Sequence, residues 1–153
     1  MKRRSLIAVA LALLLSSRAV GEPPPLAVVV GRDSVITRMS VDQLRDIYLR
    51  RQRILPNGQR VIPINLPPSN PARDRFSRAV LGRPSQDLMA YWNDRYFEGI
   101  TPPLVLPSAT AIIAYLANEP AAIAYLPLSQ VTEDARVLLV LSEAPSAPDA
   151  SGR

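Results

Sequence analysis

The sequence contains no cysteine and no histidine, and Lys2 is its only lysine. These absences exclude disulfide bonds, thiol nucleophiles, zinc sites built on cysteine or histidine, and histidine-based catalytic triads. Any catalysis would have to rest on carboxylates, hydroxyls, arginine or backbone dipoles. This set of groups is poor for an ordinary hydrolase. The sequence therefore predicts a protein that is not an enzyme, with no catalytic residue, no metal site and no cofactor.

The N-terminal segment has the three parts of a secretory signal peptide. Basic residues at positions 2–4 precede an apolar run over 6–15, and Ala19-Val20-Gly21 supplies the small residues of a cleavage site. The apolar run spans about 15 Å as a helix, roughly half of a bilayer core. We therefore predict a signal peptide over 1–21, cleaved after Gly21, and a periplasmic location. An uncleaved membrane anchor is the alternative.

The predicted cleavage lowers the net charge of the exported chain, and with it the case for an anionic partner such as nucleic acid. Four of the 18 Lys+Arg residues lie in the predicted signal peptide and none of the 13 Asp+Glu residues does, so the exported chain would carry 14 basic and 13 acidic residues, a net charge of +1. A charge this small predicts no nucleic-acid partner, because such partners require a basic surface. The membrane would be contacted only through an uncleaved signal segment.

The 153 residues, 48% of them hydrophobic, are enough for one globular domain, which we place at 22–141. Apolar runs predict strands at 26–30, 61–64, 104–106, 122–126 and 137–141. Helix-start signals at Ser40, at Ser69 or Asn70, at Ser85 and at Ser108 predict four helices between them. The strand at 26–30 is apolar on both faces, which is typical of parallel pairing. The prediction is an α/β sandwich with a mostly parallel or mixed sheet flanked by helices, followed by a disordered tail at 142–153.

Ligands of parallel sheets bind beyond the carboxyl ends of the strands, which indicates the loops 31–34, 65–73 and the stretch after Tyr125. The second loop, Asn65-Leu-Pro-Pro-Ser69-Asn70-Pro-Ala-Arg73, leads from a strand into a helix start, where backbone N–H groups attract anions. An arginine one turn later adds paired donors. The predicted ligand-binding residues are Ser69, Asn70 and Arg73, with Asn65 and Ser34 as additional candidates. The alternative is that Ser69 only caps the helix and Arg73 is solvated.

Three other groups of residues have simpler interpretations. The helical spacing of Trp92 and Tyr96 predicts core packing within the only aromatic cluster. The basic run Arg50, Arg51 and Arg53 is interpreted as a solvated helix end, with a partner site as the alternative. A solvated helix face is likewise predicted for Asp42 and Asp46.

The order of motifs resembles the phosphate-binding proteins of ABC transporters, within the type 2 periplasmic binding protein superfamily. The matching stretches are Ser40-Val-Asp-Gln-Leu-Arg-Asp-Ile-Tyr48, Asn57-Gly58-Gln-Arg-Val-Ile-Pro-Ile-Asn65, the Ser69 helix start with Phe76, and Ala121-Ala-Ile-Ala-Tyr125-Leu. They correspond to a family pattern of the form "L..IF.G....W.dG..v.pi.R...SGT...F" and a later "pGAIGY". The resemblance covers roughly residues 26–141.

The chain departs from this pattern within the anion-binding loop. Asn65 stands where the family has arginine, and Asn70 and Pro71 stand where it has Gly-Thr, while Ser69 matches the motif serine. Leu55 replaces the family tryptophan, and Ala124 replaces the glycine before the final tyrosine. Family members hold the anion between two lobes, which needs about twice this length. The chain thus resembles a short, single-lobe member.

This resemblance implies an exported solute-binding-like protein that binds phosphate or a similar oxyanion without catalysis, in connection with an ABC permease. The alternative is an interaction module that has lost its ligand and serves as an accessory to an envelope complex, a transporter or a sensor. A dimer that rebuilds a two-sided cleft is also compatible with the sequence.

Overall fold

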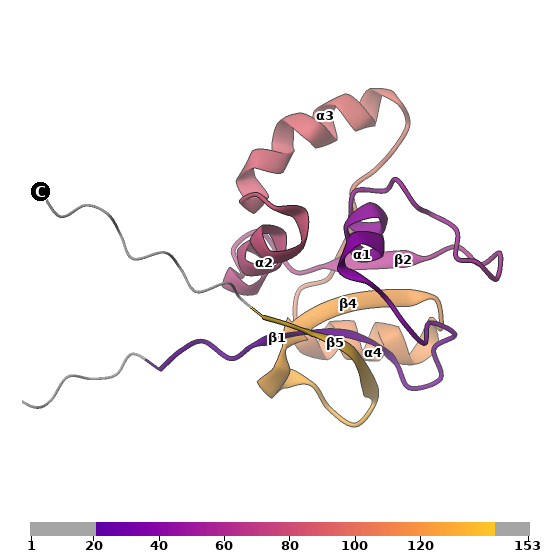
Figure 1. Cartoon of the computed structure of the whole chain (residues 1–153), viewed down its shortest axis with the longest axis vertical. Helices are drawn as coiled ribbons and strands as arrows, with labels where there is room; N and C mark the ends of the chain where they lie inside the picture. The colour runs from indigo at the N-terminus through magenta and orange to yellow at the C-terminus, as the bar shows by residue number, and fades with distance from the viewer. Residues whose placement is uncertain (1–20, 143–153) are drawn as a thin grey trace, which may run out of the picture.

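The strand β1 (Leu26–Gly31) is buried along its whole length and lies in the interior of the sheet. The structure, a computed structural model, describes residues 21–142 (Figure 1). Residues 1–20 of the predicted signal peptide and 143–153 of the predicted tail lie outside the described residues. The predictions for those segments therefore remain predictions.

The sheet has five strands in the order β3-β2-β4-β1-β5 and is mixed. Its other strands are β2 (Ile62–Asn65), β3 (Leu104–Val105), β4 (Ala122–Pro127) and β5 (Ala135–Leu141). β2 runs parallel to β3 and β4, whereas β1 runs antiparallel to β4 and β5. The α/β class and the order of elements are confirmed. The parallel pairing expected for β1 is wrong, because its apolar run reflects burial on both faces rather than strand direction.

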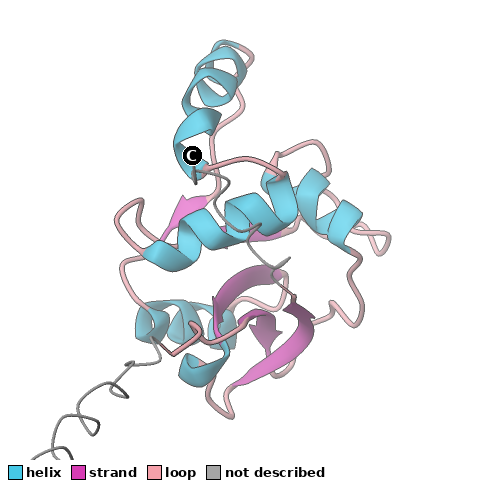
Figure 2. Ribbon diagram, turned by 60° about the vertical axis from the view of Figure 1, so that its left-hand side comes forward, coloured by secondary structure: helices cyan, strands magenta, loops and turns pink. Residues whose placement is uncertain are grey.

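Helices cover both faces of the sheet (Figures 1 and 2). The helix α1 (Val41–Tyr48) starts with the predicted capping box, in which Ser40 and Gln43 exchange side-chain and backbone hydrogen bonds. The helix α4 (Ala109–Asn118) is capped by Ser108 as predicted, and it packs against β1, β4 and β5. These local signals are reliable because each cap satisfies N–H groups within its own first turn.

The helix α2 (Pro71–Phe76) begins after Asn70, whose side chain accepts a hydrogen bond from the N–H of Ala72 at 3.0 Å. It continues through a π-helical turn, η1 (Ser77–Leu81), and ends at Gly82 in the left-handed conformation. Asn70, the second of the two predicted caps, is therefore the cap of this helix.

The second helix of the predicted pair differs from expectation. It is a 3₁₀ turn, η2 (Ser85–Leu88), followed by α3 (Met89–Phe97). Ser85 does not cap it; instead the backbone N–H of Ser85 donates to Asp74 Oδ1 at 2.9 Å. Figure 2 shows α3 standing away from the sheet, and none of its residues is buried. The prediction of a core position is wrong for Tyr96, which is 68% exposed, while Trp92 is half-buried.

A short 3₁₀ turn, η3 (Leu128–Gln130), joins β4 to β5. Among residues 21–142, no helix is long and apolar enough to cross a membrane. The same residues contain no group of three or more acidic side chains placed to hold a metal ion.

A close approach between β1 and α4 yields the first prediction. A Cβ atom added to Gly31 would lie 2.1 Å from the carbonyl oxygen of Leu116, so the helix would have to move. We expect Gly31→Ala to lower the free energy of unfolding by about 3 kcal/mol in urea denaturation. Gly58→Ala is the control, because its Cβ meets open space and only the positive φ of 84° is penalised, by about 1 kcal/mol. Equal losses for the two variants would contradict the tight contact.

Candidate functional site

The loop 65–73 lies at the sheet edge where the parallel strands β2, β3 and β4 end. Asn65 is the last residue of β2, and Tyr125 lies near the end of β4. The hydroxyl of Tyr125 donates to Asn65 Oδ1 at 2.9 Å and accepts from the N–H of Leu66 at 3.4 Å. The strand that precedes the loop is therefore tied to the neighbouring strand through one side chain.

Three packed aromatic rings lie beneath this edge. Phe76 stacks on Tyr125 with centroids 3.9 Å apart and planes within 6°, and it lies 4.6 Å from Tyr48. The hydroxyl of Tyr48 donates to the carbonyl oxygens of Ile64 at 2.9 Å and Ile123 at 3.3 Å. The rings join α1, α2 and β4, and the two hydroxyls satisfy backbone groups of β2 and β4.

Burial raises the pKa of the Tyr48 hydroxyl well above its ordinary value, and the nearby Tyr125 raises it further, against a smaller lowering by the hydrogen bond to Ile64. Burial also raises the pKa of Tyr125, partly offset by its hydrogen bond with Leu66 and by the charge of Arg73. Both side chains therefore stay neutral at physiological pH. As neutral hydroxyls they can continue to donate to the backbone and to Asn65.

Four of the five predicted ligand-binding residues come together on the loop 65–73. Ser69 is exposed, Asn70 caps α2, and Arg73 is half-buried with its Nη1 donating to the carbonyl oxygen of Leu66 at 3.0 Å. The alternative that Ser69 caps the helix is therefore wrong, because Asn70 is the cap, while Arg73 is half-buried rather than fully solvated. Pro71 contributes no N–H group to the loop.

Several donors on the loop remain available after these bonds. Both Asn65 and Asn70 use their amide oxygen within the protein. Among residues 21–142, no partner is found for their NH₂ groups, for the Ser69 hydroxyl or for the remaining nitrogens of Arg73. Amides, a hydroxyl and a guanidinium are suitable donors for an oxyanion.

The cavity beside the loop is small. It is lined by Asn65 and Arg73 from the loop and by Trp92 from α3, among others, and its volume is about 10 Å³. That is room for about one water molecule. A cavity of this size has no room for an oxyanion.

Ser34, the fifth predicted residue, lies at the opposite end of the sheet. Because β1 runs antiparallel to β4, the end of β1 lies beside the start of β4, far from Asn65. The Ser34 hydroxyl donates to the carbonyl oxygen of Pro120 at 2.6 Å and accepts from the N–H of Ile36 at 3.1 Å. The structure does not bring Ser34 to the other four residues, because the prediction depended on a parallel β1.

Sequence reasoning assigned no role in the candidate site to three residues that line or support it: Tyr48, Tyr125 and Trp92. The apolar spacing placed Tyr48 and Tyr125 in core elements, but which backbone group each hydroxyl would reach depends on strand pairing. The one available signal is general, since a buried tyrosine hydroxyl usually has a partner.

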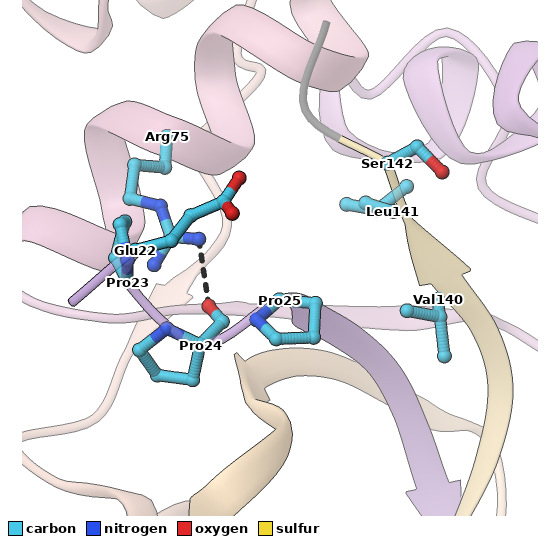
Figure 3. Close-up of a pocket in the computed structure, with 8 residues that line it drawn as sticks. All are labelled: Glu22, Pro23, Pro24, Pro25, Arg75, Val140, Leu141 and Ser142. Atoms are coloured by element: carbon cyan, nitrogen blue, oxygen red, sulfur yellow. Dashed lines mark hydrogen bonds between the residues drawn. The ribbon is translucent and has the colours of Figure 1, made fainter. Parts of the chain in front are cut away.

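A separate hollow lies near α2 and is shown in Figure 3. It has a volume of about 450 Å³ and lies between Glu22–Pro25 and the end of β5. Arg75 lines one side of it from α2 and donates from Nη2 to the carbonyl oxygen of Pro24 at 2.7 Å. None of the five predicted ligand-binding residues lines this hollow.

Comparison with known proteins gives a consistent result for the fold. No protein-family model and no curated protein matches the chain. Solved structures do match, among them an ABC-type phosphate transport receptor from Vibrio cholerae, with a TM-score of 0.61 and 16% identity over 75% of this chain. A putative phosphate ABC transporter substrate-binding protein from Clostridium perfringens, solved with bound phosphate, matches with a TM-score of 0.59 and 15% identity over 75% of this chain. PstS from Borrelia burgdorferi matches with a TM-score of 0.56 and 16% identity over 80% of this chain.

The described chain has the fold of these binding proteins. The match covers 45% of the Vibrio cholerae chain, 44% of the Clostridium perfringens chain and 49% of the Borrelia burgdorferi chain, so this chain spans less than half the length of each. The predicted resemblance is thereby confirmed for the fold of one α/β lobe. At identities of 15–16%, the comparison carries no residue roles.

The two buried tyrosines predict how stability depends on pH. In the unfolded chain they ionise near pH 10, whereas the folded protein holds them protonated to higher pH. Stability from these groups is therefore fully present below about pH 10 and lost above it, by up to about 1.4 kcal/mol per pH unit for each tyrosine. Urea denaturation between pH 8 and pH 11.5 measures this slope.

Two variants test whether the buried tyrosines cause this dependence of stability on pH. Tyr125→Phe should remove about half of the slope above pH 10, because one of the two buried hydroxyls is gone. Tyr96→Phe is the control, since its ring is largely exposed, and it should leave the slope unchanged. A slope that persists undiminished in Tyr125→Phe would show that other groups cause it.

Proposed function

We propose that the protein is a non-catalytic solute-binding-like protein that binds phosphate or a similar oxyanion at the loop 65–73. The observation that carries the proposal is the set of available donors on Ser69, Asn65 and Arg73, placed where the parallel strands of a binding-protein fold end. Arg73 supplies a positive charge on the same loop as the exposed Ser69. The bound phosphate named for the Clostridium perfringens structure supports this choice of ligand.

The geometry predicts modest affinity. The cavity of about 10 Å³ beneath the loop cannot enclose an anion, so phosphate would be held from one side and would keep much of its hydration. Arg73 would contribute the largest share, because a charge-assisted hydrogen bond is about twice as strong as a neutral one. A second copy of the chain that covers the loop would complete such a site.

The proposed setting follows from the predicted signal peptide. An exported protein that binds an oxyanion would act in the periplasm and deliver its ligand to an ABC permease. The phosphate transport receptor of Vibrio cholerae is a protein of similar fold whose role is transport.

Phosphate should stabilise the full chain against heat. A ligand present at a hundred times its dissociation constant adds about 2.7 kcal/mol of stability, which raises the melting temperature by several degrees. We expect Arg73→Ala to lose this shift, whereas Arg32→Ala, an exposed arginine near the opposite end of the sheet, should retain it. Potassium chloride at matched ionic strength controls for screening. No shift with phosphate or sulfate at tens of millimolar would contradict the proposal.

A second candidate function, an interaction module, is favoured by the surface of α3. Met89, Tyr96 and Phe97 are 70%, 68% and 88% exposed on this short helix. Large apolar side chains grouped on a protein surface are typical of contact sites for other proteins. Such a module would act as an accessory to an envelope complex, a transporter or a sensor, without needing phosphate.

Affinity capture from envelope extracts separates the two candidates. For an interaction module we expect one stoichiometric partner, recovered equally with and without phosphate and lost with Phe97→Asp. Leu128→Asp is the control, because Leu128 is 39% exposed on η3 rather than on α3. Recovery of no stoichiometric partner, or of one that Phe97→Asp still binds, would contradict a role for α3.

A further inference from the structure

Arg50 has an unusual backbone for a residue other than glycine. It directly follows the residue that caps the C-terminal end of α1, Leu49, and has a φ of 60°, the only positive φ of a non-glycine residue among residues 21–142. Glycine is the usual residue at this position, because a side chain is disfavoured there. The N–H of Arg50 donates to the carbonyl oxygen of Ile47 at 3.0 Å, a bond that glycine would also make. The backbone therefore gives no reason for an arginine.

The side chain of Arg50 is also incompletely paired. Its Nε is buried and has no hydrogen-bond partner within residues 21–142. Buried donors of this kind normally have an acceptor. Asp46, the acidic residue four positions earlier, instead pairs with Arg51 at 3.6 Å. Residues 21–142 therefore supply no acceptor to this Nε.

The charges around Arg50 have the same sign. Burial lowers the pKa of its guanidinium, and the positive charges of Arg53 and Arg60 lower it further. Like charges held together without a counter-charge are unfavourable, so an anion placed among them would be attracted. The basic run that the sequence indicated as a solvated helix end thus includes one guanidinium that is partly withdrawn from water.

A hollow with room for an organic molecule lies beside Arg50. Its volume is about 420 Å³, and Arg50 and Arg60 line it together with an apolar wall that includes Pro103 and Leu104. This volume is typical of small-molecule pockets. The hollow lies toward the start of β2, whereas Asn65 is the last residue of that strand. None of the residues of the loop 65–73 lines it.

We infer that this hollow is a second ligand site, which takes a small organic anion with a phosphate or carboxylate group on an apolar body. The anionic group accepts hydrogen bonds from Arg50 and Arg60, and the apolar body packs against Pro103 and Leu104. The paired donors of a guanidinium suit both kinds of anionic group. This site is independent of the oxyanion site proposed at the loop 65–73.

Phenyl phosphate is a suitable probe, with inorganic phosphate for comparison. Titrated into the ¹⁵N-labelled full chain, phenyl phosphate should shift the amide signals of residues 60–62 and 104, and should bind more tightly than inorganic phosphate does at the same amides. Shifts confined to the loop 65–73 would support the first site alone and would overturn the second. Absence of shifts at residues 60–62 and 104 at 10 mM phenyl phosphate would overturn it as well.

Arg50→Gly gives the sharpest test. We expect phenyl phosphate to bind about ten- to a hundredfold more weakly, while the melting temperature stays equal or rises, because glycine adopts a φ of 60° without strain. Arg53→Gln is the control, since Arg53 does not line the hollow, and it should change the dissociation constant less than threefold. Arg73→Ala should leave binding here unchanged.

Two results with Arg50→Gly would overturn the inference. Binding within twofold of the unmodified chain would show that Arg50 does not contact the probe. A clear fall in melting temperature would show that the arginine is retained to support the fold. Arg60→Gln provides a second variant that leaves the strained backbone in place, and it should also weaken binding of phenyl phosphate by about tenfold.

Discussion

The contact among Tyr48, Phe76 and Tyr125 is the interaction on which this fold depends. It joins α1, α2 and β4 in a single apolar cluster, and its two hydroxyls satisfy the carbonyl groups of Ile64 and Ile123 and the N–H group of Leu66. A buried carbonyl or N–H group without a partner would cost about 1–3 kcal/mol. The position of the loop 65–73 is therefore set by the core beneath it rather than by the loop itself.

The two arginines that line candidate sites differ in the hydrogen-bond partners that the protein supplies to them. Arg73 donates to the carbonyl oxygen of Leu66 and so helps to hold the loop. Arg50 leaves its buried Nε without a partner within residues 21–142, beside two further positive charges. The first is a structural residue with spare donors. The inferred second site depends on the second, because a bound anion would give its buried Nε an acceptor.

The features that could be predicted from the sequence are those that depend on interactions between residues a few positions apart in the chain. The caps at Ser40 and Ser108 and the apolar strands depend on local hydrogen bonds and spacing, and they appear as expected. The direction of β1 depends on partners about 100 residues away, so its burial could be predicted and its pairing could not. Ser34 was misplaced relative to the loop for that reason. Tyr96 has the spacing of a core residue but lies on α3, which stands away from the sheet and has no buried residue.

The place of Trp92 has a practical consequence. It is the only tryptophan in the chain, and it lines the same small cavity as Asn65 and Arg73. The tryptophan fluorescence of the protein therefore originates beside the loop 65–73. When tryptophan is excited selectively over the five tyrosines, its emission reports whether this part of α3 stays beside the loop or moves into water, without any attached dye.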